Sequence, residues 1–241
     1  MEERVTDSMQ TNAQDCIPGD VQNSAQKRTT IPATGTTLVL GIGNILWADE
    51  GFGVRAVEAF HAAYAPTEGV SVRDGGTLGA YLLNDIEEAD RLLVFDCCDF
   101  HEEPGTLRVL RNDDVRIWTS TKISPHQTGM NDLLAIAQIQ GRCPKEIAIV
   151  GVQPDELNDY GGSLTKKVRR KVPEAVVLAV DILKEWGIEL QPRAPGDKPE
   201  PLSTDSLSLT AYEAGRPSEE EACRIGDPRY FPMGPGPSQG S

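Results

Sequence analysis

The side chains in this sequence that are best suited to acid–base or metal chemistry are two carboxylates and one histidine. Glu50 lies in the segment GIGNILWADEGFGVR, Asp96 in FDCCD and His126 in KISPHQTG. One imidazole with two carboxylates is a set of nitrogen and oxygen donors suited to a borderline divalent ion such as nickel or zinc. The His-Glu-x-x-His helix of common metallopeptidases is absent from the sequence. The residues alone therefore indicate a carboxylate–histidine metal site that only the fold can assemble.

The glycine-rich segment before Glu50 also has other interpretations. Gly41-x-Gly43 after an apolar run resembles the start of a dinucleotide-binding turn, but the third small residue expected at position 46 is Leu46. No phosphate-binding loop of the form Gly-x-x-x-x-Gly-Lys-Ser/Thr occurs in the sequence. Glu50 could instead favour a helix N-terminus, where a negative charge is stabilising. A nucleotide-binding protein is thus disfavoured, while a purely structural role for Glu50 stays open.

The other two candidates have equally ordinary alternatives. Asp96 stands where an apolar run ends, so its carboxylate either enters a crevice or caps a loop. His126 lies in a loop flanked by proline and glycine, whereas His61 falls in an expected helix and His101 in a charged turn. A lone loop histidine is by default a surface residue. What favours a site is the combination of the histidine with the two carboxylates.

The elements that must position these residues alternate along the chain. Hydrophobic patterning predicts strands at 36–44, 70–77, 90–100, 105–111 and 146–154 and helices at 50–65, 78–89, 128–141 and 164–187. This alternation predicts an α/β domain with one twisted, mostly parallel sheet and helices on both faces. The strand at 105–111 is expected at an edge, and Pro173 should kink the last helix or begin a second one. In such sheets functional groups gather beyond the carboxyl ends of the strands.

Composition divides the 241 residues into a domain and two tails. Residues 1–36 are polar and show no sustained apolar periodicity, and the 49 residues from 193 onward contain 8 Pro and 6 Gly. Segments of this kind do not bury enough apolar surface to offset the entropy of ordering them. We therefore expect a disordered extension at 1–36, one folded domain at 37–191 and a disordered tail at 192–241.

Charge and cysteine usage restrict the partners and the compartment. The formal net charge of −14 argues against binding to nucleic acid or to an anionic membrane surface. No run of 18 apolar residues and no secretory signal is present. The five cysteines have no paired spacing, which indicates reduced thiols and a cytoplasmic protein. The adjacent Cys97 and Cys98 are interpreted as buried small residues rather than as nucleophiles, because nothing near them in the sequence activates a thiol.

Five segments, in order, resemble the [NiFe]-hydrogenase maturation protease family. They are GIGNILWADEGFGVR, DGGT at 74–77, the FD that contains Asp96, SPHQ at 124–127 and GVQPDELNDYGGSLT at 151–165. Together they cover essentially all of 37–190. The WADEGFGVR and DYGGSLT stretches are similar to the branch that serves membrane-bound uptake hydrogenases.

The resemblance implies a three-layer domain of the phosphorylase/hydrolase type and an endopeptidase of aspartic or metallo type. Its substrate would be the hydrogenase large-subunit precursor, from which it removes the C-terminal extension after nickel insertion. Glu50, Asp96 and His126 are then the metal ligands and catalytic residues, and Asp74 is a weaker candidate for positioning the substrate. We expect the nickel to be presented by the substrate, so that cleavage is licensed only after insertion.

One alternative from another class remains at this stage. A non-enzymatic nickel-binding assembly factor could use the same three residues to hold the precursor. Release of a C-terminal peptide distinguishes the two functions. Which carboxylate acts as the general base is also open, because a carboxylate that ligates a metal is a poor free base.

Overall fold

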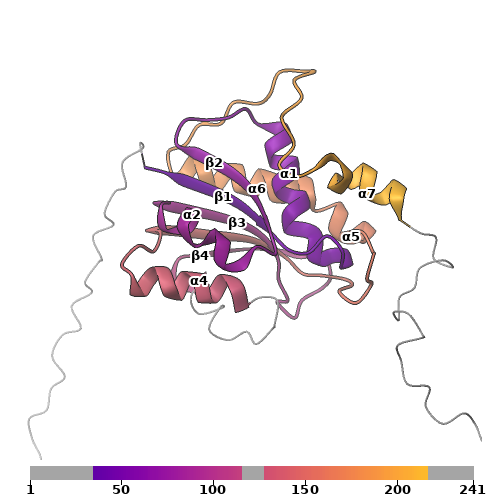
Figure 1. The fold of residues 1–241 in the computed structure, drawn as a ribbon, viewed down its shortest axis with the longest axis horizontal. Helices are drawn as coiled ribbons and strands as arrows, with labels where there is room; N and C mark the ends of the chain where they lie inside the picture. Colours follow the sequence, from indigo (N-terminus) through magenta and orange to yellow (C-terminus); the bar gives the residue numbers. More distant parts are fainter. Residues whose placement is uncertain (1–34, 116–127, 217–241) are drawn as a thin grey trace, which may run out of the picture. The chain divides into compact units, whose positions relative to one another are not determined.

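Five short apolar segments pair into one sheet in this computed structural model, which describes residues 35–115 and 128–216. The strands are β1 (Thr37–Ile42), β2 (Val70–Gly76), β3 (Arg91–Cys97), β4 (Leu107–Arg111) and β5 (Glu146–Val152). They lie in the order β2-β1-β3-β5-β4, and all are parallel except β4, which pairs antiparallel with β5 (Figure 1). The predicted mostly parallel sheet is confirmed, and so is the edge position of the strand predicted at 105–111.

Helices cover both faces of the sheet, as predicted (Figure 1). They are η1 (Ala48–Gly51), α1 (Phe52–Ala63), η2 (Gly79–Leu82), α2 (Leu83–Glu87), α4 (Thr128–Ile139), α5 (Lys166–Arg169), α6 (Val172–Glu185), η3 (Asp205–Leu207) and α7 (Leu209–Gly215). The apolar sides of α1 and α6 form one core with the sheet, and those of α2 and α4 form the other. Because both faces are covered, the central strands carry apolar side chains on both faces rather than alternating apolar and polar residues. No helix within the described ranges has both the length and the hydropathy to cross a bilayer.

The long helix predicted at 164–187 is divided into two helices. The Thr165 side chain caps α5 by accepting a hydrogen bond from Val168 N–H, and α5 ends at Arg169. Pro173 then lies in the first turn of α6, where a missing N–H costs no helical hydrogen bond. Of the two outcomes predicted for Pro173, the second helix is the one observed.

The N-terminal turn of α1 lies directly on the backbone of two neighbouring strands. A Cβ on Gly53 would stand 2.1 Å from the carbonyl oxygen of Ile42 and 2.2 Å from that of Phe95. A Cβ on Gly41 would similarly stand 2.4 Å from the carbonyl oxygen of Gly53. Glycines at these positions therefore permit a contact between helix and sheet that no side chain would allow.

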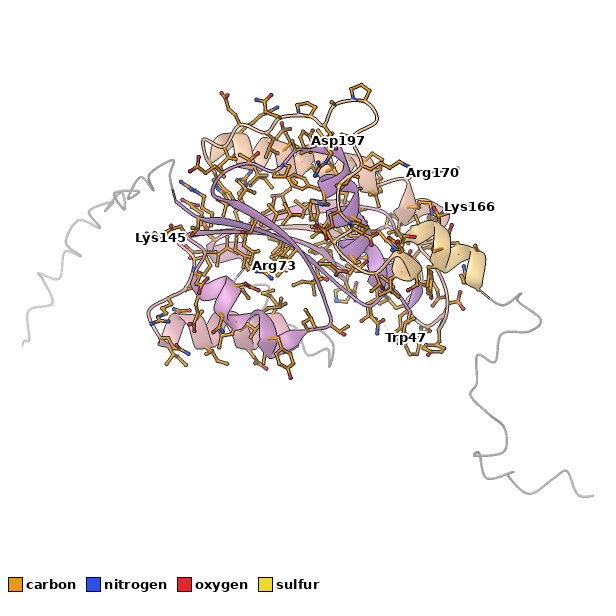
Figure 2. The ribbon with its side chains drawn as sticks, turned by 45° about the horizontal axis from the view of Figure 1, so that its top comes forward. Trp47, Arg73, Lys145, Lys166, Arg170 and Asp197 are labelled. Carbon is orange, nitrogen blue, oxygen red and sulfur yellow. The ribbon has the colours of Figure 1, made fainter. Side chains whose placement is uncertain are left out.

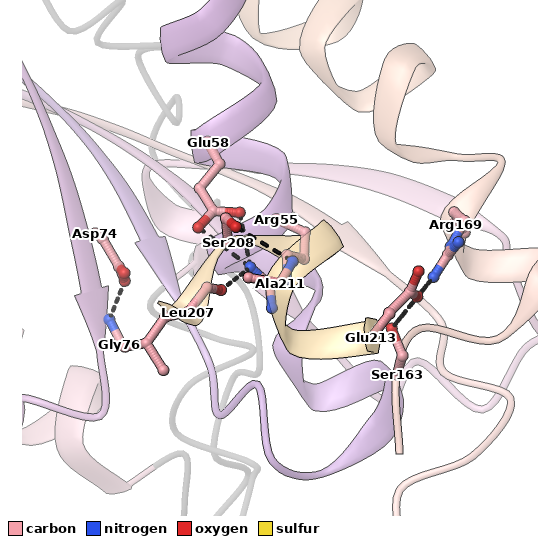
Figure 3. A network of polar contacts seen from close by, with 10 residues as sticks. All are labelled: Arg55, Glu58, Asp74, Gly76, Ser163, Arg169, Leu207, Ser208, Ala211 and Glu213. Carbon is pink, nitrogen blue, oxygen red and sulfur yellow. Dashed lines mark hydrogen bonds and ion pairs between the residues drawn. The ribbon is translucent and has the colours of Figure 1, made fainter. Parts of the chain in front are cut away.

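Residues 192–216 are described by the structure, although the sequence predicts that a disordered tail begins at 192. The segment is bonded to the domain, since Arg55 Nη1 donates to Leu207 C=O at 2.7 Å and Tyr212 OH donates to Gly162 C=O at 3.2 Å. Figure 3 shows Arg55 beside Leu207, and Ser163 and Arg169 meeting Glu213. Composition alone does not report these tertiary contacts. The rest of the two predicted tails, 1–34 and 217–241, lies outside the described residues.

The close approach at Gly53 gives a stability prediction. In a Gly53→Ala variant the new methyl group meets two backbone oxygens, so α1 must move away from β1 and β3. We expect a loss of about 2–3 kcal/mol in the free energy of unfolding, even after the better helix propensity of alanine. Urea denaturation measures it. Gly215→Ala is the matched control, because a Cβ there meets no atom within 4 Å; equal denaturation midpoints for the two variants would contradict the packing argument.

Candidate active site

Three parallel strands bring the predicted carboxylates to one edge of the sheet. In the register of the sheet, Gly41 on β1 pairs with Asp74 on β2 and with Phe95 on β3, so Asp74 and Asp96 lie on the strands at either side of β1. Figure 2 shows Trp47, which follows β1, at the opposite end of the sheet from Lys145, which precedes β5. This end, called here the carboxyl-end edge, is formed by the carboxyl ends of the parallel strands, where functional groups gather in such sheets.

The backbone of Glu50 lies over the end of β1, where Gly43 leaves room for it. Gly43 has a φ of +139°, and a Cβ there would stand 1.9 Å from the carbonyl oxygen of Glu50. Gly43 N–H donates to Gly76 C=O at 3.0 Å, which also ties the turn to β2. The short helix η1, which contains Glu50, contacts β3 as well. The backbone of Glu50 therefore lies above strand ends that include the one carrying Asp96.

Asp96 is the second-last residue of β3 and is half-buried. Its Oδ1 accepts a hydrogen bond from the backbone N–H of Cys97 at 2.7 Å. This bond joins two consecutive residues of β3, so whether Asp96 also caps a loop stays a prediction. The next two residues point to opposite faces, and Cys97 belongs to the α1/α6 core while Cys98 belongs to the α2/α4 core. The interpretation of both cysteines as buried packing residues is confirmed.

His126 lies outside the described residues, two positions before α4 begins at Thr128. Within 35–115 and 128–216, no three His, Cys, Asp or Glu side chains gather closely enough to hold a metal ion. The structure thus places Glu50 and Asp96 at one edge, and the set of three ligands stays a prediction.

Asp49 is a residue of this edge that sequence reasoning missed. Its carboxylate has no exposed surface. Oδ2 accepts hydrogen bonds from the N–H groups of Asp155 and Glu156 at 2.9 and 3.0 Å. Oδ1 accepts from Thr165 N–H at 2.7 Å, and the Thr165 hydroxyl donates to Oδ2 at 3.1 Å. One buried charge thereby joins η1, and with it Glu50, to both ends of the loop between β5 and α5.

A second group of charged side chains, of which Arg55 is buried, lies on α1 and near the end of β2. Arg55 is 5% exposed, and its Nη1 donates to both carboxylate oxygens of Glu58, at 3.2 and 2.9 Å. Its guanidinium lies 5.7 Å from the centre of the Tyr212 ring. Burial raises the pKa of Glu58, against the opposing effect of Arg55. Burial also raises the pKa of Asp74, although Asp74 Oδ1 accepts a hydrogen bond from Gly76 N–H at 2.9 Å (Figure 3).

Known proteins resemble most of this chain. The sequence profile of hydrogenase maturation proteases matches residues 54–182. The hydrogenase expression/formation protein HupD of Rhodobacter capsulatus is 52% identical over 196 residues, which are 81% of this chain and 92% of HupD. HoxM of Azotobacter vinelandii is 48% identical over 199 residues, which are 82% of this chain and 95% of HoxM.

The fold leads to the same conclusion. The structure of the hydrogenase maturating endopeptidase HybD from Escherichia coli superimposes with a TM-score of 0.62 and 39% sequence identity, and covers 66% of this chain and 98% of HybD. The fold is therefore that of an α/β endopeptidase. The chain belongs to the hydrogenase maturation protease family.

Replacement of Asp49 should release the loop that it holds. Asp49→Asn keeps the size of the side chain but turns an amide N–H₂ toward groups that are themselves donors. We expect a loss of about 2–4 kcal/mol in unfolding free energy, with faster hydrogen exchange at the amides of 155–165. Asp155→Asn is the control, since it removes only a surface ion pair with Lys167 and should cost less than about 1 kcal/mol. Equal losses for the two variants would contradict the role given to Asp49.

The raised pKa of Asp74 predicts a pH dependence. A carboxyl whose pKa is higher in the folded state stabilises the fold below its unfolded pKa of about 4, and this contribution is lost as pH rises through the folded pKa. The side-chain amide of the Asp74→Asn variant cannot titrate, and it keeps an oxygen that accepts from Gly76. The unfolding free energy of the wild type should therefore fall relative to that of Asp74→Asn as pH rises above about 4.

Urea denaturation at several pH values measures this difference. Asp181→Asn makes the same charge change at an exposed position on α6 and serves as the control. A wild type that gains stability over Asp74→Asn as pH rises would show that the sign is wrong.

Proposed function

We propose that this protein removes the C-terminal extension from the large-subunit precursor of a [NiFe] hydrogenase of the uptake type, once nickel has been inserted. Membership of the hydrogenase maturation protease family supports the peptidase activity. The observation that carries the proposal is the position of Glu50 over the end of β1, next to β3, which carries Asp96 near its end. The cytoplasmic location predicted from the sequence belongs to the same proposal.

The proposed chemistry uses one of the two carboxylates as the proton carrier. Hydrolysis of a peptide bond requires a water molecule to lose a proton as its oxygen attacks the carbonyl carbon. The amide nitrogen must then gain a proton as the C–N bond breaks. Glu50 and Asp96 are the two candidates for the carboxylate that accepts the first proton and returns one to the leaving nitrogen. Both side chains are half-buried, so they are accessible to a substrate while partly removed from water.

Nickel enters this proposal as part of the substrate. Carboxylate oxygens and an imidazole nitrogen are donors that nickel accepts, so Glu50, Asp96 and His126 would bind an ion already held by the precursor. A precursor without nickel lacks that shared ion, and its cleavage would wait for insertion. The bound ion would also polarise the scissile carbonyl group. The support for His126 is the sequence resemblance, while Glu50 and Asp96 have the geometry of the strand ends in addition.

Purified protein incubated with nickel-loaded or nickel-free precursor tests the proposal, with intact mass measured before and after. We expect a single C-terminal loss from the nickel-loaded precursor only. Glu50→Gln and Asp96→Asn should slow this loss by at least about 100-fold, because each removes a carboxylate that binds the nickel or carries a proton. Glu189→Gln, an exposed carboxylate beyond α6, should cleave at the wild-type rate.

The outcomes separate the components of the proposal. Cleavage at the wild-type rate by Glu50→Gln would remove Glu50 from the mechanism. Equal cleavage of both precursors would remove nickel as the recognition element. A complex that forms with wild-type protein but releases no peptide would favour an assembly factor over a peptidase.

A further inference from the structure

The edge strand β2 has a side with no hydrogen-bonded neighbour among the described residues. On its other side it pairs with β1, beginning with Thr37 N–H, which donates to Gly69 C=O at 2.8 Å. Hydrogen bonding alternates along a parallel pair, so the odd-numbered residues of β2 bond to β1, whereas Val72 and Asp74 direct their N–H and C=O groups away. No described residue accepts from either of these N–H groups. An edge of this kind is a template for an added strand.

A groove of about 810 Å³ lies along this edge, and residues of β2 form its floor. One wall comes from η2 and α2 and includes Leu78 and Tyr81. Their side chains are strongly exposed for apolar residues, at 52% and 86%. The opposite wall comes from His61 on α1 and from residues 198–202. The groove thus combines open backbone groups at its floor with apolar contact surface at one wall.

The wall formed by the C-terminal segment is fixed to the end of α1. Arg193 Nε donates to His61 C=O at 2.9 Å, and Arg193 Nη1 pairs with Asp197 at 3.0 Å. The His61 ring lies at hydrogen-bond distance, 2.9 Å, from Glu200 C=O. Figure 2 labels Arg73 on the floor strand and Asp197 in this segment. The wall is therefore held by several bonds and does not rest on packing alone.

The groove leads to the candidate active site. Its floor strand runs through Asp74, which pairs with Gly41, and ends at Gly76, whose C=O accepts from Gly43 N–H. Gly43 is the residue on which the backbone of Glu50 lies. An extended chain beside β2 would thus reach the carboxyl ends of the strands, where Glu50 and Asp96 lie.

We propose that this groove binds the C-terminal extension of the precursor in an extended conformation, as a strand added to β2. This rests on the proposed function, because it takes the precursor as the substrate. The outward groups of Val72 and Asp74 supply the backbone hydrogen bonds, and Tyr81 and Leu78 contact alternate side chains of the extension. The two walls leave room for a single strand, about 4.8 Å from β2. They disfavour a second folded copy of this chain, because its own walls would have to enter the same groove.

Hydrogen exchange at single-residue resolution tests strand addition. The full-length Glu50→Gln variant is bound to nickel-loaded precursor, and the exchange of backbone amides is compared with that of the variant alone. We expect the amides of Val72 and Asp74 to slow by at least about tenfold. Those of Ser71 and Arg73, which already bond to β1, are the internal control and should not change.

Three results would overturn the proposal. The first is a complex in which Val72 and Asp74 exchange as in the variant alone. The second is slow exchange of these amides in the variant alone at every concentration, which would mean that another part of this chain already covers the open side of β2. The third is slowing that grows with the concentration of the variant alone, which would mean that a second copy of this chain covers the open side of β2. Cleavage by the wild type, measured in parallel, tests the proposed function separately. Slower exchange without cleavage would support binding in the groove and contradict the peptidase activity.

A kinetic measurement tests the wall of the groove. Tyr81→Ala should raise KM for the precursor about tenfold and leave kcat within about twofold, because the ring contacts the substrate away from the reacting bond. Ile139→Ala on α4 is the matched control, since Ile139 and Tyr81 are equally exposed at 86%. An unchanged KM for Tyr81→Ala, or equal changes in the two variants, would contradict the proposal.

Discussion

The arrangement of the carboxyl-end edge depends on the buried carboxylate of Asp49. A charge with no exposed surface is tolerated in a protein only where hydrogen-bond donors replace the water it has lost. Four donors from the loop after β5 do so here. Since Glu50 is the next residue, the bonds that satisfy Asp49 also fix the place of Glu50 over the strand ends. The glycine contacts of α1 set the distance between helix and sheet, and Asp49 sets the connection to the opposite side of the edge.

Much of the fold was predictable because each main element carries its own signal. The runs that become β1, β3 and β5 each contain a stretch of consecutive apolar residues, and a proline such as Pro173 favours the first turn of a helix. The structure differs from the prediction where tertiary contacts decide. The predicted helices at 50–65 and 78–89 each begin as a separate 3₁₀ turn. Residues 192–216 have the composition of a disordered tail, yet they meet a buried arginine and several polar groups of the domain.

The candidate site was predictable in part, for a related reason. Glu50 and Asp96 stand next to apolar strands, and the rule that groups gather at strand ends singles them out. Asp49 gives no comparable signal, because its partners lie 106 to 116 residues later in the sequence. Arg55 likewise resembles any basic residue of a helix, and only the packed structure places it among Glu58, Tyr212 and the C-terminal segment. A single sequence reports what a residue is and what lies beside it in the chain, but it does not report such distant pairings.

The long separation between Asp49 and its partners has a consequence for biosynthesis. A ribosome makes the chain from the N-terminus, so Glu50 and Asp96 are synthesised well before Asp155 and Thr165, whose groups hold Asp49 in place. Until that later stretch has emerged and β5 has joined the sheet, the Asp49 carboxylate has none of its four donors and stays in water. The edge that carries the carboxylates is therefore completed late in synthesis, and a nascent chain that stops before residue 165 lacks the arrangement that positions Glu50.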